Sequence, residues 1–267
     1  MDIKKNTLLS RVFNNTDMKI YEIAYAALGN DWNYKCRNSS FTRIYMITKG
    51  GGRVIFPERA QELVPGRIYI IPSVMNFECE CDSYMEKLYF HVVLPGQSGY
   101  DIFSRLPGCA EIEGGGIIEK CIDLFNANSM DAVMRLKHIL YDVTLKAFEC
   151  ENIYIGDVDE YSEITRKAIS YIDENMKASI KIDEIASSIY VSSSKLKKQF
   201  RCDTGVSVGK YIDDKLMFIA ENEIRKNKHS IREISEKLGF CDQFYFSRKF
   251  SERYGLPPTK YRQSCRT

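Results

Sequence analysis

The side chains best suited to chemistry in this sequence are basic and polar residues that recur near its C-terminal end. Lys198 and Arg248 stand at equivalent places in two similar stretches of the chain. Ammonium and guanidinium groups bind phosphate or the acceptor edge of guanine, so paired basic positions on exposed helices indicate nucleic-acid recognition. The surrounding sequence must then supply helices that hold the two positions at a fixed separation.

An internal repeat provides such helices. Four identities recur at an offset of 50: Phe200, Gly205, Lys210 and Tyr211 match Phe250, Gly255, Lys260 and Tyr261. Upstream the offset is 49, where Ile182, Ile185 and Ile189 match Ile231, Ile234 and Leu238. A constant offset indicates two copies of one supersecondary unit, and two copies are too few for a solenoid.

Each copy has the sequence pattern of a helix, a tight turn and a second helix. In the second copy Ser230 and Glu233 form a capping-box pattern, Gly239 suits the turn, and Asp242 can cap the next helix. Ser192 is the corresponding cap in the first copy. One amphipathic helix over 211–224 is expected between the copies. It would hold two recognition helices about one DNA turn apart, ~34 Å.

The second copy also carries a family resemblance. Residues 230–240, 242–250 and 255–262 closely resemble the signature of AraC/XylS-type transcriptional regulators, and the resemblance covers about residues 160–265. Two positions depart from the usual pattern: Ser235 stands where Ala is common, and Lys215 where Arg is common. Both are mild, because Ser is small and Lys keeps the charge. The resemblance implies a DNA-binding domain over 160–267, double-stranded promoter DNA as partner, and a possible contact with RNA polymerase.

By that resemblance the DNA contacts fall on the exposed face of each second helix. Base-edge contacts are expected from Ser194, Lys197, Lys198, Gln243, Phe244 and Arg248; phosphate contacts from Ser193, Lys195 and Arg201; Ser247 completes the DNA-contacting set. Arg or Lys suits guanine, Gln suits adenine, and an aromatic edge can touch a thymine methyl group. Helix packing is the alternative for Phe244, and Tyr245 is expected to support the core.

Composition agrees with an ordinary globular protein of two domains. The chain has 267 residues and a formal net charge of +2. Residues 160–267 hold 21 Lys and Arg against 15 Asp and Glu, whereas the preceding part holds 17 against 21. A basic C-terminal part suits a phosphate-binding surface, although an ordinary solvated face would give the same excess.

The first part of the sequence predicts short strands. Residues 19–28, 42–50, 52–57, 67–72 and 87–93 are rich in Ile, Val, Tyr and Phe and are separated by Gly and Pro turns. Their spacing predicts an antiparallel jelly roll, cupin-like, over residues 1–112, with residues 63–72 as its central hairpin. The fold class is therefore α+β, with this sheet domain before an all-α domain of two tandem helix-turn-helix units.

A cupin can be a metal enzyme, but this sequence lacks the usual ligands. It has three His, at positions 91, 138 and 229, and no H-x-H pair. We therefore expect no metal, no cofactor and no catalytic residue. The expected use of the domain is binding a small-molecule effector, with a carbohydrate as the first hypothesis. Its lining is expected from Trp32, Arg43, Tyr45, Tyr89 and His91; the alternative is that these residues only pack in the sheet.

The segment 113–150 changes to a helical period. An apolar stripe that includes Val133, Met134 and Leu140 predicts helices that pack on the sheet domain or pair two subunits as a homodimer. Residues 149–159 read as the interdomain linker.

The sequence as a whole indicates a regulator of transcription, with activation of a catabolic operon as the first expectation. Alternatives are a metal-dependent cupin enzyme fused to a DNA-binding module and a constitutive DNA-binding protein with a structural barrel. No signal peptide and no membrane span are expected, and nine scattered Cys suit a reducing cytoplasm.

Overall fold

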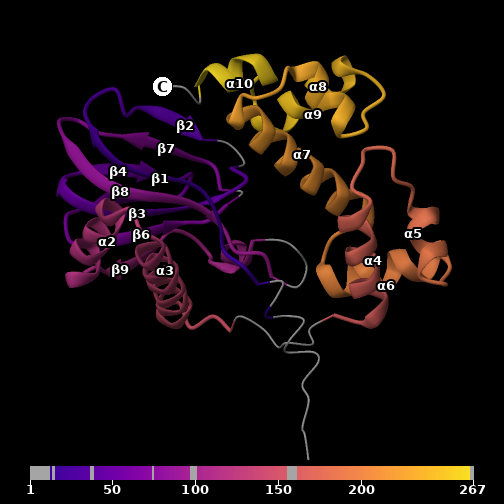
Figure 1. The fold of residues 1–267 in the computed structure, drawn as a ribbon, viewed down its shortest axis with the longest axis horizontal. Helices are drawn as coiled ribbons and strands as arrows, with labels where there is room; N and C mark the ends of the chain where they lie inside the picture. Colours follow the sequence, from indigo (N-terminus) through magenta and orange to yellow (C-terminus); the bar gives the residue numbers. More distant parts are fainter. Residues whose placement is uncertain are drawn as a thin grey trace, which may run out of the picture. The chain divides into compact units, whose positions relative to one another are not determined.

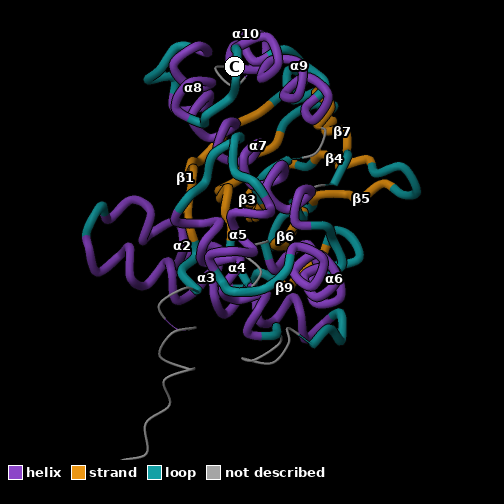
Figure 2. The backbone as a smooth tube through the Cα atoms, turned by 90° about the vertical axis from the view of Figure 1, so that its right-hand side faces the viewer, coloured by secondary structure: helices purple, strands orange, loops and turns teal. Residues whose placement is uncertain are grey.

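The computed structural model describes residues 13, 16–36, 39–73, 75–96, 101–154 and 161–264. The chain forms two compact units, one of Ser10–Gly96 with Tyr100–Gly156 and one that contains Asp157–Thr267. Within the described residues every strand belongs to the first of these units, and the second is helical (Figures 1 and 2). We call them the sheet unit and the helical unit.

The sheet unit contains two antiparallel sheets. The larger has the order β1 (Lys19–Leu28), β8 (Met85–Val93), β3 (Thr42–Gly50), β6 (Arg67–Ile71) and β9 (Ala110–Glu113). The smaller has the order β2 (Tyr34–Cys36), β7 (Phe77–Glu80), β4 (Gly52–Ile55) and β5 (Ala60–Leu63). A 3-10 turn, η1 (Ile102–Arg105), precedes β9. The mixed α and β fold with antiparallel sheets first is therefore confirmed.

The prediction that residues 63–72 form a central hairpin is wrong. Strands β5 and β6 lie in different sheets, so the chain changes sheets at the turn between them. Gly66 has a φ of 79° there, and its N–H donates to the Ile47 carbonyl at 3.0 Å. The apolar sequence of β6 suits a strand with β3 and β9 on its two sides, whereas the polar β5 forms an edge.

The larger sheet separates two hydrophobic cores, because successive side chains of a strand point to opposite faces. Ile44 and Met46 of β3 belong to an outer core that is covered by helices. Tyr45 and Ile47 belong to an inner core that also contains residues of the smaller sheet. This inner core contains most of the residues that the sequence proposes as an effector site.

Helices α2 (Gly116–Ala127) and α3 (Met130–Cys150) cover the outer core (Figure 1). Asn128, with a φ of 46°, ends α2, and the Ser129 side chain accepts the Ala132 N–H at 3.1 Å to begin α3. Leu140 is fully buried in this core, so of the two alternatives left open for the stripe, Leu140 packs on the sheet unit and does not belong to a dimer seam. Of the predicted linker, residues 149–150 are the end of α3, and residues 155–160 lie outside the described residues.

The helical unit repeats the same elements at the predicted offsets. Its helices are α4 (Glu163–Glu174), α5 (Ile182–Ser188), α6 (Ser193–Thr204), α7 (Val208–Lys226), α8 (Ile231–Lys237), α9 (Gln243–Tyr254) and α10 (Pro258–Ser264). Helix α8 begins 49 residues after α5, and α9 begins 50 residues after α6. Helix α7 is continuous and longer at both ends than the predicted 211–224.

Candidate functional site

Helices α6 and α9 are built by the same local chemistry. The Ser192 side chain accepts the Lys195 N–H at 3.2 Å, and the Asp242 carboxylate accepts the Tyr245 N–H at 2.7 Å. These bonds satisfy backbone donors that the first helical turn leaves free. Both helices end at a glycine with a φ of 75°, Gly205 and Gly255. Each therefore presents twelve residues in the same register.

The two helices bury equivalent faces and expose equivalent faces. Leu196 and Phe200 of α6, like Phe246 and Phe250 of α9, are fully buried. Most of the predicted DNA-contacting residues lie on the opposite side: Ser194, Lys195, Lys197, Lys198, Arg201, Gln243, Phe244 and Arg248 are exposed, and Ser193 and Ser247 are half-buried. The repeat thus gives two helices whose free surfaces carry the predicted residues.

The basic residues on these surfaces differ from their neighbours in their pairing. Lys249 and Arg253 of α9 form ion pairs with Asp213 and Asp214, at 2.7 and 3.1 Å. Within the described residues no ion pair involves Lys195, Lys197, Lys198, Arg201 or Arg248. The Arg248 guanidinium instead lies 5.4 Å from the centre of the Tyr245 ring. The exposed cations of α6 and α9 are therefore available to an external anion.

The contacts of Ser193, Phe244 and Tyr245 distinguish their roles. The Ser193 hydroxyl donates to the Asp183 carboxylate of α5, so it has a partner inside the unit. Phe244 is 87% exposed and therefore does not pack in the helix core. Phe240 has that packing role, since its ring centre lies 5.1 Å from that of Phe246. Tyr245 is half-buried 6.1 Å from Phe240, as a supporting residue would be.

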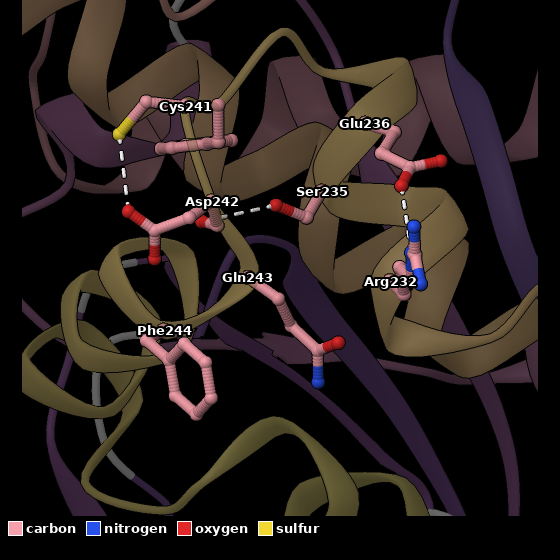
Figure 3. Close-up of a pocket in the computed structure, with 8 residues that line it drawn as sticks. Arg232, Ser235, Glu236, Cys241, Asp242, Gln243 and Phe244 are labelled. Atoms are coloured by element: carbon pink, nitrogen blue, oxygen red, sulfur yellow. Dashed lines mark hydrogen bonds and ion pairs between the residues drawn. The ribbon is translucent and has the colours of Figure 1, made fainter.

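A shallow hollow of about 330 Å³ lies where α8 meets the start of α9 (Figure 3). The Ser235 hydroxyl donates to the Asp242 carbonyl at 3.3 Å across it, and Arg232 pairs with Glu236 at 2.8 Å on its α8 side. Gln243 and Phe244 project from the beginning of α9 beside the hollow (Figure 3). The small Ser235 thus fits the close approach of the two helices.

Sequence reasoning missed two features of the helical unit. Tyr190, 96% exposed, has a φ of 58° in the turn before α6, where the second copy has Gly239 at 72°. A left-handed conformation is unfavourable for a side-chain-bearing residue. Glu221 is buried in α7, where it accepts from Arg225 at 3.1 Å and from the Tyr261 hydroxyl. That network joins α7 to α10.

In the sheet unit the five predicted effector residues lie close together. The Trp32 and Tyr45 ring centres are 6.2 Å apart, those of Tyr45 and Tyr89 are 6.5 Å apart, and those of Tyr89 and His91 are 5.0 Å apart. Arg43 pairs with His91 across β3 and β8. The structure therefore brings together residues from three segments of the sequence.

A carboxylate missed by the sequence reasoning joins this group. Glu22 of β1 accepts from the Tyr89 hydroxyl at 2.8 Å, and its other oxygen lies 2.8 Å from His91 Nδ1. Register explains the contact, because Glu22 stands opposite His91 in the pairing of β1 with β8. Glu22 therefore fixes the orientation of both side chains.

Arg43 is 4% exposed and rests against aromatic rings. Its guanidinium carbon lies 4.6 Å from the centre of Phe41 and 5.0 Å from that of Phe77. Its Nε and Nη1 atoms have no hydrogen-bond partner among the described residues. Buried polar groups usually have partners, so these two donors require an explanation.

Lys87 is a second buried cation, and sequence reasoning missed it as well. It is 3% exposed, and its Nζ lies 3.5 Å from the centre of the Tyr45 ring and 4.0 Å from that of Trp32. Burial lowers the pKa of Lys87 to about 7, because a charged amine loses its hydration there. Its position two residues before Tyr89, on the same face of β8, was the available signal in the sequence.

The described part of the chain offers neither a metal-binding cluster nor a membrane-spanning helix. No group of three or more His, Cys, Asp or Glu side chains there has the arrangement needed to hold a metal ion. No helix in the described segments is long and apolar enough to cross a membrane.

Comparisons with known proteins agree with the geometry of the helical unit. The family described as helix-turn-helix domain matches residues 185–264. The chain is 30% identical over 102 residues to the regulatory protein SoxS of Salmonella typhimurium, covering 38% of this chain and 95% of SoxS. It is 22% identical over 236 residues to the lactose operon transcription activator of Staphylococcus xylosus, covering 82% of each.

The fold is shared with a solved structure over most of the chain. ToxT from Vibrio cholerae O395 superposes with a TM-score of 0.60 and 14% identity, covering 90% of this chain and 96% of ToxT. At this identity the likeness concerns the fold.

Proposed function

From the premise that the chain belongs to the AraC-type family of DNA-binding transcription regulators, we propose that its sheet unit controls promoter binding by holding a small-molecule effector. We assign residues 1–112 to a cupin-like jelly roll, 113–150 to connecting helices and 160–267 to the DNA-binding domain. We further propose that the protein activates a catabolic operon and that its effector is related to a carbohydrate. A relative named as an activator of the lactose operon supports that choice.

We infer that α5–α6 and α8–α9 are tandem helix-turn-helix units. Helices α6 and α9 enter successive major grooves, where Lys197, Lys198 and Arg248 meet guanine edges. Lys195 and Arg201 contact phosphates, which position the protein without reading sequence. The observation that carries this proposal is the set of exposed cations on α6 and α9 that form no ion pair within the described residues, beside others that do.

The direct test compares a base-reading residue with a phosphate-binding one. Sites selected from random duplexes by the full chain give the cognate sequence. Arg248→Ala should weaken binding to it by about 10-fold to 100-fold and relax selection at one position. Lys195→Ala should instead weaken binding equally on all sequences and lower the salt dependence by about one counterion.

A matched control removes one charge elsewhere. Lys146 is exposed on α3, and Lys146→Ala should leave selection and affinity unchanged. An equal loss on cognate and random DNA for Arg248→Ala would reassign that residue to phosphate contact. Unchanged binding for both variants would contradict the interface.

We further propose a homodimer through the free side of α3. Met130, Val133, Met134 and Leu145 are exposed there, while Leu140 and its neighbours pack inside the unit. An apolar stripe left on the surface suits a second copy of the chain. Contact with RNA polymerase stays part of the proposal for an activator.

A further inference from the structure

The inner core of the sheet unit holds two cations without a counter-ion. Arg43 and Lys87 are both more than nine-tenths buried, and they lie on the adjacent strands β3 and β8. Within the described segments no carboxylate lies within ion-pair distance of either side chain. A buried charge is strongly unfavourable unless it is paired, so this arrangement calls for a partner.

No side chain packed around these cations supplies the negative charge. Burial raises the pKa of the Cys79 thiol to about 11 and raises that of the Tyr45 phenol, so both are neutral near pH 7. Glu22 is engaged with Tyr89 and His91. The titratable or charged groups acting on Lys87 are Arg43 and Tyr45 from β3, Tyr89 from β8 itself, and Cys79 and Cys81 from or beside β7. The core therefore carries the Arg43 charge throughout, and that of Lys87 below about pH 7.

Aromatic ring faces pack against the two cations but provide no acceptor for their hydrogen-bond donors. Phe41 and Phe77 cover the Arg43 guanidinium, and Trp32 and Tyr45 cover the Lys87 ammonium. Such contacts stabilise positive charge, but a ring face provides no lone pair in the plane of the guanidinium. The Nε and Nη1 donors of Arg43 stay open among the described residues.

We propose that the effector is a small organic carboxylate whose carboxylate group binds between Arg43 and Lys87, with Trp32 and Tyr45 against its body. This rests on the proposed function, which places an effector in the sheet unit, and it names the chemical class. Arginine suits the group because each of the open Nε and Nη1 donors can make a charge-assisted hydrogen bond to a carboxylate oxygen. A neutral sugar could accept the same hydrogen bonds, but it would leave the Arg43 charge uncompensated, and also that of Lys87 in its protonated form.

The proposal has a consequence for pH. The pKa of Lys87 is about 7 in the empty protein, and an anion beside it favours the protonated form. Carboxylate affinity should thus be greatest below pH 7 and should fall as the pH rises above it, by up to tenfold for each pH unit. A neutral ligand that does not need the charge would lack this slope.

The test uses acids with matched neutral amides. The full chain is titrated with glucuronate and glucuronamide, benzoate and benzamide, and hexanoate and hexanamide, by calorimetry and by Trp32 fluorescence at pH 6 and pH 8. At least one acid should bind saturably, and it should exceed its amide in affinity at least tenfold at pH 6. It should bind about fivefold to tenfold more weakly at pH 8 than at pH 6, because the protonated fraction of Lys87 falls about tenfold between these two values. The three pairs distinguish a sugar acid from an aromatic or an aliphatic acid.

Two variants locate the site. Lys87→Met and Arg43→Met should each abolish the acid's binding while circular dichroism shows a folded protein, and Lys146→Met, which removes an exposed charge, should bind normally. Absence of binding by every acid at 10 mM overturns the proposal. So does binding that is equal for acid and amide, or that is unchanged in Lys87→Met.

A separate measurement, the affinity for the selected DNA site with and without the ligand, tests the proposed function. An acid that binds through Arg43 and Lys87 but leaves DNA affinity unchanged supports the anion site and contradicts the effector role. A neutral compound that binds in the sheet unit and changes DNA affinity supports the effector role and overturns the anion site.

Discussion

Replacing Lys87 with methionine should make the protein more stable. The substitution keeps an unbranched chain of similar length, removes the buried charge, and leaves a thioether against Trp32 and Tyr45, a favourable contact. Residues that bind ligands commonly reduce stability in the empty protein, whereas residues that only support a fold increase it. The free energy of unfolding therefore distinguishes a ligand-binding role of Lys87 from a role in supporting the fold.

The magnitude follows from the pKa. A fall from the ordinary 10.5 to about 7 corresponds, at about 1.4 kcal/mol for each pH unit, to roughly 5 kcal/mol against the charged form. The two aromatic contacts return roughly 1–2 kcal/mol of this. We expect Lys87→Met to be more stable by about 3–4 kcal/mol at pH 6.

The direction in which wild-type stability changes with pH also follows from the pKa of Lys87. The folded protein has the lower pKa, so between pH 7 and 10.5 the unfolded chain binds more protons, and the wild-type stability rises with pH. The advantage of the variant should then shrink to about 2 kcal/mol at pH 9.

Urea unfolding followed by Trp32 fluorescence at pH 6 and pH 9 measures both values, because Trp32 lies in the same core. Lys146→Met, an exposed replacement, should change stability by less than about 0.5 kcal/mol. A variant that is less stable than wild type at pH 6 would refute the reasoning, because it would show that the aromatic contacts of Lys87 outweigh its desolvation.

Three other changes test the helical unit and α3. Tyr190→Gly should raise stability by about 1 kcal/mol in urea unfolding, because glycine tolerates the positive φ; a loss would mean that the exposed ring has contacts of its own. Asp242→Ala should cost about 1 kcal/mol and weaken DNA binding by loss of the α9 cap, whereas Asp242→Asn should retain most of both; equal damage by the two variants would make charge, not capping, the cause. Met134→Glu, at a side chain 68% exposed, should convert a dimer into a folded monomer in sedimentation velocity, and a wild-type protein that is already monomeric would contradict the proposed seam.

The helical unit could be predicted closely because its signals are local and occur twice. Ser192, Ser230 and Asp242 cap helices through bonds to residues three positions away, and the repeat shows independently where each helix begins. Gly239 was a turn residue by its type alone. Tyr190 was not, because nothing in its type indicates a positive φ.

The sheet unit was harder to predict from the sequence, because its contacts join segments that are far apart along the chain. Alternation gave the strands, but it could not decide that β5 and β6 belong to different sheets. The meeting of Lys87 with Trp32, and of Glu22 with His91, depends on strand register that a single sequence does not contain. The side of α3 that packs inward likewise depended on where the outer core lies.

Helix α7 determines the separation of α6 and α9, the two helices that we propose read DNA, through its own length and helical rotation. It runs without a break from Val208 to Lys226 and is anchored to α10 through Glu221. One residue inserted in an α-helix moves the rest of the helix along its axis by about 1.5 Å and rotates it by about 100°. One base pair inserted between two DNA half-sites rotates them by only about 35°. Four inserted residues would come near that rotation, at about 40°, but would lengthen the helix by about 6 Å against about 3.4 Å for the base pair. Natural binding sites for this protein should therefore hold their two halves at one invariant spacing.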